Sequence, residues 1–154
     1  MTTHYRERLW PAPWLFISTA LVIPASLLVF LPISTTAGVI VAIVLYAACV
    51  AALIIGGPVI EVADGEFRAG RARLPLAIAG SVEGFTGDGA RAERGQKLDA
   101  RTWLLIRGWI SPLVKIQNLD ERDSAPYWVV STRHPDAVVA AITAAKQRAS
   151  DGIG

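Results

Sequence analysis

The feature that most constrains this chain is an uncharged segment from Leu9 to Ile60, which contains no Asp, Glu, Lys, Arg or His in 52 residues. All charged residues of the 154-residue chain lie before or after it. They make up 18% of the sequence, against about 25% in ordinary soluble domains. This distribution excludes an ordinary soluble globule. The length leaves room for a membrane segment and one small domain.

Two apolar runs inside this segment are each long enough to cross a membrane. They cover residues 14–31 and 37–55, and about 20 residues at 1.5 Å per residue span a hydrocarbon core of about 30 Å. A polar turn at residues 32–36 separates them and begins with a proline that ends the first helix. Gly-Gly-Pro at residues 56–58 ends the second. We therefore predict an antiparallel transmembrane hairpin over residues 13–57.

Arginines flank the predicted hairpin on one side only. Arg6 and Arg8 precede the first span, three arginines within residues 68–73 follow the second, and the turn between the spans is uncharged. Positively charged residues stay on the cytoplasmic side, so we expect both termini in the cytoplasm, with residues 1–12 as a juxtamembrane tail. A cleaved signal peptide is the competing interpretation. The length of the first run and the second run directly after it favour the hairpin.

Residues 58–148 have the alternation and the turn residues of a small β-rich domain. Asp64-Gly65 is a two-residue hairpin signal, because a type I′ turn needs positive φ at both central residues. Short strands joined by tight turns suggest a barrel or sandwich, and residues 87–96 are expected to form a polar loop. The predicted strands cover residues 58–62, 66–69, 73–76, 78–85, 101–107, 113–119 and 127–132.

The domain is predicted to end in an amphipathic helix. Pro135 suits the first helical position, Asp136 suits the positive end of the helix, and an apolar stripe runs from Val138 to Ala145. Six or seven antiparallel strands followed by one helix is the order of elements in a pleckstrin-homology-like domain, with an α+β roll as the alternative. Residues 149–154 are expected to form a flexible tail.

Three segments have a more distinctive sequence: residues 5–11 (Tyr-Arg-Glu-Arg-Leu-Trp-Pro), 63–70 (Ala-Asp-Gly-Glu-Phe-Arg-Ala-Gly) and 127–133 (Tyr-Trp-Val-Val-Ser-Thr-Arg). In these segments the chain resembles the uncharacterised actinobacterial membrane-protein family of unknown function 3093. The resemblance implies a bacterial inner-membrane protein with a small cytoplasmic domain and no assigned activity. The architecture is also similar to that of bacterial membrane proteins that carry a pleckstrin-homology-like module after a helical hairpin. Neither resemblance supplies a catalytic residue.

The chain offers few residues for catalysis or metal binding. Its two histidines, His4 and His134, lie at opposite ends, and its single cysteine, Cys49, lies in the second apolar run. Nucleophilic catalysis needs a nucleophile beside a base, and zinc needs several such ligands. The acidic turn at residues 120–123 lacks the Gly and Glu of a calcium loop. We therefore expect no catalytic residue, no metal and no cofactor. A net charge of only +2 disfavours nucleic-acid binding.

Arg107, Trp109 and Ile110 lie in a turn predicted between two strands and form the first candidate interaction surface. Trp and Arg are enriched at protein interfaces, and Trp is enriched at membrane surfaces. An exposed turn of this composition would contact lipid headgroups or a partner protein. The alternative is that Trp109 folds back into the core.

The second candidate surface is basic. Arginines that converge near the bilayer would each contribute ~1 kcal/mol of attraction to anionic lipid. The alternative is a solvated face balanced by Glu61, Glu66 and Glu83. The candidate lipid-facing residues are Arg6, Arg8, Arg68, Arg71 and Arg73, and Arg101, Arg107 and Arg133 are further basic residues of the domain.

These observations favour a non-enzymatic module that the hairpin holds at the inner leaflet, where it binds a protein partner and, secondarily, anionic lipid. The alternative is an accessory subunit of a larger membrane complex, held through the alanine-rich second span. A third class, an enzyme acting on lipid or cell-envelope intermediates, would need a pocket in which carboxylates and arginines converge.

Overall fold

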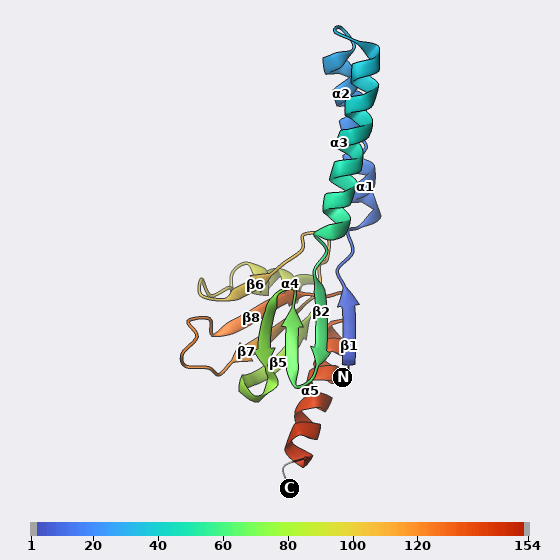
Figure 1. Cartoon of the computed structure of the whole chain (residues 1–154). Coiled ribbons are helices and arrows are strands. Elements are labelled where there is room, and N and C mark those ends of the chain that lie inside the picture. The colour runs from blue at the N-terminus through green and yellow to red at the C-terminus, as the bar shows by residue number, and fades with distance from the viewer. Residues whose placement is uncertain (1–2, 153–154) are drawn as a thin grey trace. The chain divides into compact units, whose positions relative to one another are not determined.

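The computed structural model describes residues 3–152 (Figure 1). The chain divides into two compact units, residues 10–57 and an α+β domain built from the segments on either side of them. The helices and strands are β1 Thr3–Arg8, α1 Pro13–Thr19, α2 Val22–Phe30, α3 Thr35–Ile55, β2 Val59–Ala63, β3 Glu66–Ala69, β4 Ala72–Pro75, the 3₁₀ helix η1 Leu76–Ile78, β5 Ala79–Phe85, α4 Gly87–Arg94, β6 Trp103–Leu105, β7 Leu113–Asn118, β8 Tyr127–Ser131 and α5 Pro135–Asp151.

The unit at residues 10–57 contains the two predicted apolar segments. Pro13–Phe30 and Thr35–Ile55, with 18 and 21 residues, are long and apolar enough to cross a membrane by length and composition. The second helix begins two residues earlier than predicted. Its N-terminus is capped by Ser34, whose hydroxyl oxygen accepts a hydrogen bond from the Ala37 backbone N–H at 3.3 Å.

The first apolar helix, Pro13–Phe30, is interrupted for two residues between α1 and α2. Pro24 explains the break. It has no backbone N–H to donate to the Ala20 carbonyl, and its ring crowds that carbonyl. The Ala20 carbonyl instead accepts from the Ile23 N–H at 3.0 Å, which tightens the local turn.

Small residues allow α2 and α3 to pack closely. Gly38 and Ala42 are the buried residues of α3. A Cβ added to Gly38 would lie 3.3 Å from the Cβ of Phe30 and 3.5 Å from a methyl carbon of Leu27. A larger side chain at this position would therefore push the helices apart.

The first sheet of the domain, sheet A, has the strand order β1-β2-β3-β4 and is antiparallel throughout. Strand β1 precedes the apolar segments and pairs with β2, which follows them. Arg8 lies opposite Val59, and the Leu9 N–H donates to the Pro58 carbonyl at 2.9 Å. Residues 3–8 are therefore an edge strand of the domain, whereas we expected residues 1–12 to form a separate tail.

The turn between β2 and β3 has the predicted conformation. Asp64 has φ of 51° and Gly65 has φ of 74°. Positive φ at both positions is what a type I′ turn requires, and its twist matches that of the flanking strands. The prediction of a hairpin at this dipeptide is confirmed.

The second sheet, sheet B, has the strand order β5-β7-β8-β6. Strand β6 runs parallel to β8, with Leu104 opposite Val129. Residues 101–107 and 113–119, two predicted strands that follow each other in the chain, therefore do not pair, because β7 lies between β5 and β8. Among residues 3–152 the eight strands form two open sheets, so of the expected arrangements the closed barrel is not formed.

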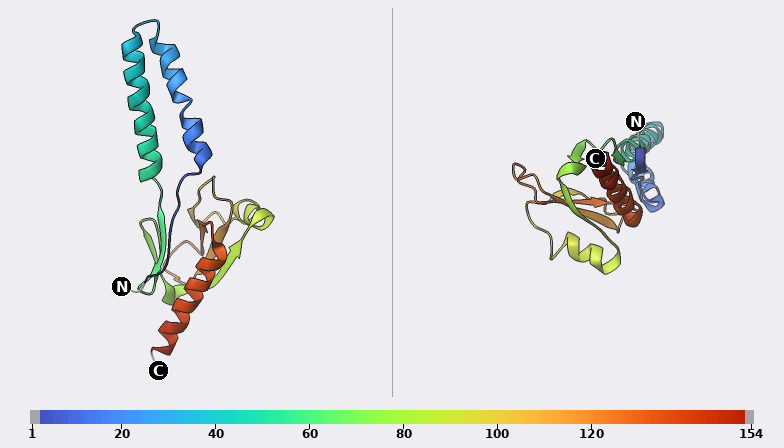
Figure 2. Two further views of the ribbon diagram at one scale, coloured as in Figure 1. Left: turned by 90° about the vertical axis from the view of Figure 1, so that its right-hand side faces the viewer. Right: turned by 90° about the horizontal axis from the view of Figure 1, so that it is seen from below.

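Helix α5 packs against β1 and β2 of sheet A and against β5 and β7 of sheet B (Figure 2). It contributes Val138, Ile142 and Ala145 to a core that both sheets share. This helix was predicted, but it continues to Asp151, so residues 149–151 are helical and not part of a flexible tail. The remainder of that predicted tail, residues 153–154, lies outside the described residues.

Helix α4 covers the other face of sheet B. We expected a polar loop at residues 87–96, but residues 87–94 are helical. Ala90 of α4 is fully buried against Leu113 of β7 and Val129 of β8. The glycines at positions 87 and 89 disfavour a helix by local propensity. Burial of Ala90 and Glu93 against the sheet overrides that preference.

Candidate functional site

The structure changes the interpretation of the first predicted surface. Ile110 is only 2% exposed and belongs to the core, so it is not a surface residue. Trp109 is half-buried and also packs against the core. The Arg107 guanidinium lies 6.0 Å from the Trp109 ring centroid. The backbone N–H of Arg107 donates a hydrogen bond to the Ser131 hydroxyl oxygen at 3.0 Å. These contacts favour the alternative in which the turn folds back against the domain.

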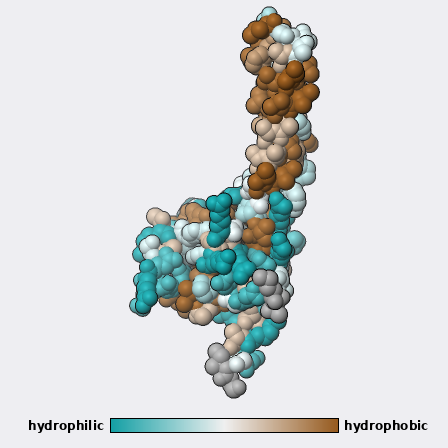
Figure 3. Space-filling view, in the orientation of Figure 1, coloured by the Kyte–Doolittle hydropathy of each residue, from teal (hydrophilic) through white to brown (hydrophobic). Residues whose placement is uncertain are grey.

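The second predicted surface is brought together by sheet A. Arg6, Arg68 and Arg73 lie in one register row with Glu61, on the face opposite Ile60, Phe67 and Leu74 of the core. We call this outward face and its Gly70–Arg71 turn the arginine face. Figure 3 shows mainly hydrophilic side chains over these strands. The arginine face carries Arg6, Arg8, Arg68, Arg71 and Arg73, and all except the half-buried Arg68 are exposed.

Arg68 is the centre of an ion-pair network on this face. Its guanidinium lies 3.1 Å from Glu66, 3.6 Å from Asp64 and 3.8 Å from Glu61. Arg73 reaches Glu66 at 4.0 Å. The expected balance of arginines by Glu61 and Glu66 is therefore present. Glu83 has no part in it, because it lies on β5 of sheet B.

The arginine face is not fully neutralised. It holds five arginines and three carboxylates, so two positive charges remain, as many as the net charge of the whole chain. Arg8 and Arg71 lie at the end of sheet A where Leu9 and Pro58 link to the apolar segments, since the Gly70 N–H donates to the Val59 carbonyl at 2.8 Å. Arg101, Arg107 and Arg133 lie outside sheet A.

A polar cluster around Glu7 was not predicted. The Tyr5 hydroxyl donates to Glu7 Oε2 at 2.8 Å, and the Thr132 hydroxyl donates to the same oxygen. The backbone N–H of Arg133 donates to Glu7 Oε1 at 2.9 Å. Burial and the hydrogen bond to the Glu7 carboxylate raise the pKa of Tyr5 from 10.0 to about 12. One carboxylate thus fastens β1 to the segment between β8 and α5.

A second unpredicted cluster lies between α4 and sheet B. Glu93 is 5% exposed, and its carboxylate accepts from Lys115 Nζ at 2.8 Å and lies 3.8 Å from Lys97 Nζ. Lys115 Nζ also lies 4.6 Å from the Tyr127 ring centroid. The adjoining cavity has a volume of about 30 Å³, which accommodates no more than one or two water molecules. This cluster therefore holds α4 on the sheet and leaves no space for a substrate.

Near this cavity, Asp99 and Arg101 form a solvent-exposed pair at 3.1 Å. Hydrogen bonds from Arg101 lower the pKa of Asp99 below its ordinary value, and Asp99 in turn raises the pKa of Arg101. Both groups remain charged at neutral pH, so neither is suited to proton transfer there.

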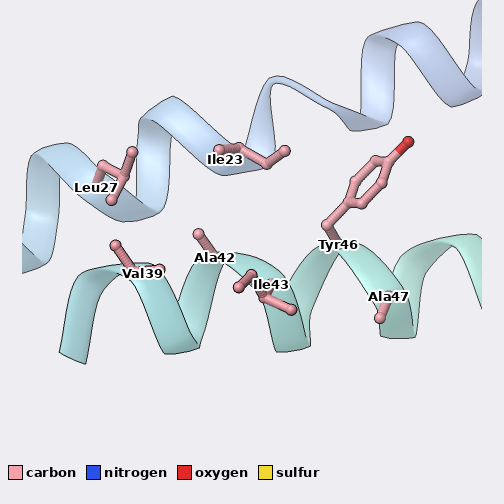
Figure 4. Close-up of a pocket in the computed structure, with 7 residues that line it drawn as sticks. All are labelled: Ile23, Leu27, Val39, Ala42, Ile43, Tyr46 and Ala47. Carbon is pink, nitrogen blue, oxygen red and sulfur yellow. The ribbon is translucent and has the colours of Figure 1, made fainter. Parts of the chain in front are cut away.

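The apolar unit contains a groove between α2 and α3 with a volume of about 250 Å³ (Figure 4). Tyr46 projects from α3 toward the first apolar segment, and its phenol is the only polar side chain among the lining residues. The lining residues are Ile23, Leu27, Val39, Ala42, Ile43, Tyr46 and Ala47. Such a groove suits an apolar occupant.

Comparison with known proteins identifies a family. The model of the family described as "Protein of unknown function (DUF3093)" matches residues 4–142. The chain belongs to this family. No curated protein and no solved structure matches the chain. The resemblance noted in the sequence is thereby confirmed over both apolar segments, both sheets and the first half of α5.

The family match includes all three segments on which the resemblance was based. Two of these, residues 5–11 and 127–133, meet in the Glu7 cluster although more than 100 residues separate them. The third, residues 63–70, contains Arg68 and two of its carboxylate partners. Among residues 3–152 no group of three His, Cys, Asp or Glu side chains is placed to hold a metal ion.

Proposed function

We propose that this protein is a multi-pass protein of the bacterial inner membrane, with both termini in the cytoplasm and a non-catalytic domain that binds a protein partner. The observation that carries the proposal is the pairing of β1 with β2 across the two apolar segments. Strands on either side of a membrane hairpin can form one sheet only when both lie on the same side of the membrane. Two spans, or none, satisfy that condition, whereas one span does not.

The same pairing argues against a cleaved signal peptide. Cleavage after the first apolar segment would remove β1. The domain would then lose the Glu7 carboxylate, which accepts hydrogen bonds from Tyr5, Thr132 and Arg133. The arginines then supply the direction of insertion, since both flanking segments are basic and the turn at residues 31–34 is uncharged. We therefore place the domain in the cytoplasm.

The domain is suited to binding because the outward face of sheet A is charged and four of its arginines, Arg6, Arg8, Arg71 and Arg73, are exposed. We infer that the domain is a pleckstrin-homology-like roll in open form. An antiparallel meander (β1–β4), a second antiparallel set (β5, β7 and β8) and a C-terminal helix across both support this inference. Strand β6, parallel to β8, and helix α4 are additions to that plan.

A binding role is favoured over catalysis by the state of the two buried polar clusters. The Glu7 carboxylate is engaged by three donors, and the Glu93 carboxylate is paired with two lysines. A general acid or base needs a free position for the proton of a substrate. Both carboxylates are instead used to join elements of the fold.

A second candidate function is that of an accessory subunit held in a larger membrane complex by its helices. The groove between α2 and α3 favours it, together with exposed alanines on α3 that would let another helix approach closely. These alanines are Ala47, Ala48, Ala51 and Ala52.

Membrane topology is tested by cysteine labelling, which is simple here because Cys49 is the only cysteine. In a Cys49→Ala background, single cysteines replace Thr3, Ser34 or Ser150. We expect a membrane-impermeant maleimide to label the Ser34→Cys variant in intact cells, and the other two only after permeabilisation. Labelling of the Thr3 and Ser150 variants on opposite sides of the membrane would overturn the topology.

The binding role is tested by photo-crosslinking in cells. A photoreactive amino acid replaces Arg73 on sheet A, Val44 on α3 or, as a control on another surface of the domain, Arg122. A specific adduct at position 73 alone supports the binding module, and an adduct at position 44 alone supports the accessory subunit. Adducts at neither position, or equally at position 122, would contradict a protein-binding sheet A.

A further inference from the structure

The arginine face extends to the end of sheet A from which the chain enters and leaves the apolar segments. We propose that it binds the anionic headgroups of membrane phospholipids. This inference rests on the proposed membrane anchoring and names a ligand for the exposed face of sheet A.

The negative charges of the arginine face gather around Arg68. All three carboxylates of the face contact Arg68, and Glu66 also reaches Arg73. They lie in the central row and toward the Asp64–Gly65 turn. The opposite end of the sheet, where Arg8 and Arg71 are exposed, therefore lies away from these carboxylates.

Arg8 and Arg71 lie close to the two points where the chain enters and leaves the apolar segments. Arg8 precedes the start of α1 at Pro13 by five residues. Arg71 follows Gly70, and a Cβ added to Gly70 would lie 3.6 Å from the Cβ of Pro58, three residues after the end of α3. Covalent connection thus keeps both arginines near the points at which the two spans leave the domain.

The arginine side chain is chemically matched to phosphate groups. The guanidinium presents paired N–H donors that match the oxygens of a phosphodiester, and it stays charged at any physiological pH. Exposed arginines on an open sheet form no enclosed site for a small phosphate compound. They attract a surface that carries many phosphates, and this attraction adds up over the arginines within reach. An anionic bilayer is such a surface.

The experiment titrates the full-length protein, purified in mild detergent, with phosphatidylglycerol and, separately, with phosphatidylcholine of the same acyl chains. Lipid-bound species are quantified by native mass spectrometry. The test variant carries Arg6→Gln, Arg71→Gln and Arg73→Gln. The matched control carries Arg91→Gln, Arg122→Gln and Arg148→Gln, which remove the same charge from exposed sites outside sheet A.

We expect the wild type and the control to bind phosphatidylglycerol more tightly than phosphatidylcholine. Each arginine removed from the face should weaken phosphatidylglycerol binding about fivefold at low salt, and all three on the order of a hundredfold. High salt should reduce the preference of the wild type. If the triple variant does not fold, Arg71→Gln alone, in an exposed turn, should still lose about fivefold.

Three results would overturn the proposal: equal binding of the two lipids by the wild type, an unchanged preference in the arginine-face variant, or an equal loss in the control. Displacement of the lipid by an excess of inorganic phosphate would indicate a small phosphate ligand instead. The titration is independent of the labelling test in cells, so a wrong topology and a wrong lipid assignment give different results.

Discussion

The two sheets of the domain differ in what covers them. Sheet B has the shared core on one face and α4 on the other, and its strands contribute buried residues to two separate apolar clusters. Sheet A has the core on one face and the arginine face on the other. Sheet B is therefore the structural centre of the domain, and sheet A is the part available to a ligand.

The charged residues of the two sheets also differ in what they contribute. Glu93 beside sheet B is nearly inaccessible to water, so its partners must compensate a desolvated charge. Arg68 and its carboxylates on sheet A keep 22–35% of their side-chain surface exposed. Water screens such pairs, and they contribute little to stability. Similar ion pairs are therefore buried beside one sheet and partly exposed on the outward face of the other.

The largest effect on stability should come from truncating a buried core residue of sheet A. Phe67 is fully buried, and its ring packs edge-on against Trp128 with 6.5 Å between centroids. Phe67→Ala should lower the free energy of unfolding by about 3–5 kcal/mol. Urea unfolding of the full-length chain in mild detergent, followed by tryptophan fluorescence, measures it. A loss below about 1 kcal/mol would mean that sheet A does not share the core of sheet B.

Breaking the buried pair beside sheet B should have the next largest effect. Lys115→Met leaves the Glu93 carboxylate with only Lys97 at 3.8 Å, and we expect a loss of about 3 kcal/mol in the same assay. The double variant Glu93→Leu with Lys115→Met removes both charges and should recover most of that loss. If the single variant is as stable as the wild type, α4 is not held by this pair.

Weakening the Glu7 cluster should have an intermediate effect. Glu7→Gln replaces a charged acceptor by a neutral one and should cost about 2 kcal/mol in the free energy of unfolding. The Tyr5 pKa should also fall toward 10 while staying above it, because burial is the largest cause of the shift. Ultraviolet absorbance titration of tyrosine measures this pKa, with Tyr5→Phe as the reference. An unchanged Tyr5 titration would contradict the contact.

The raised pKa of Tyr5 also predicts a pH dependence. The folded chain favours the protonated phenol, so this stabilisation is complete below pH 10 and is lost as the pH rises through about 12. Tyr5→Phe should remove this part of the alkaline decline in stability. Urea unfolding at several alkaline pH values compares the two proteins, and parallel declines would contradict the assignment.

The smallest effect should come from Arg68. Although Arg68→Gln breaks three ion pairs, the pairs are partly exposed, and we expect a loss below about 1 kcal/mol in the free energy of unfolding. The same variant removes the shared arginine partner of three carboxylates on the arginine face and should weaken binding of anionic lipid. A large loss of stability would show that the face is structural, and the contrast between the two sheets would then be wrong.

Several parts of the fold were predictable because short segments determine them. The apolar runs are recognisable by length and composition, and the hairpin at Asp64-Gly65 by its demand for positive φ. The start of α5 at Pro135 follows from fixed proline geometry. For the arginines two arrangements remained open, convergence near the bilayer and a solvated face balanced by carboxylates, although alternation along a strand puts every second residue on one face.

The candidate site was only partly predictable. The arginines could be named from the sequence, but their division into Arg68, bound by carboxylates, and the exposed remainder depends on the pairing of β2, β3 and β4. Ile110 was wrongly placed on the surface, because a turn sequence does not show whether the turn folds back. The Glu7 cluster had no local signal at all.

The sequence by itself determined the segments whose structure depends on neighbouring residues: the two apolar helices, the type I′ turn and the C-terminal helix. Only the tertiary structure decided that β1 completes sheet A, that β6 joins β8 in parallel and that α4 forms over sheet B. The physical reason is that strand pairing and burial connect residues far apart in the chain. Their free energy depends on the partner surface, which residue spacing along the sequence does not encode.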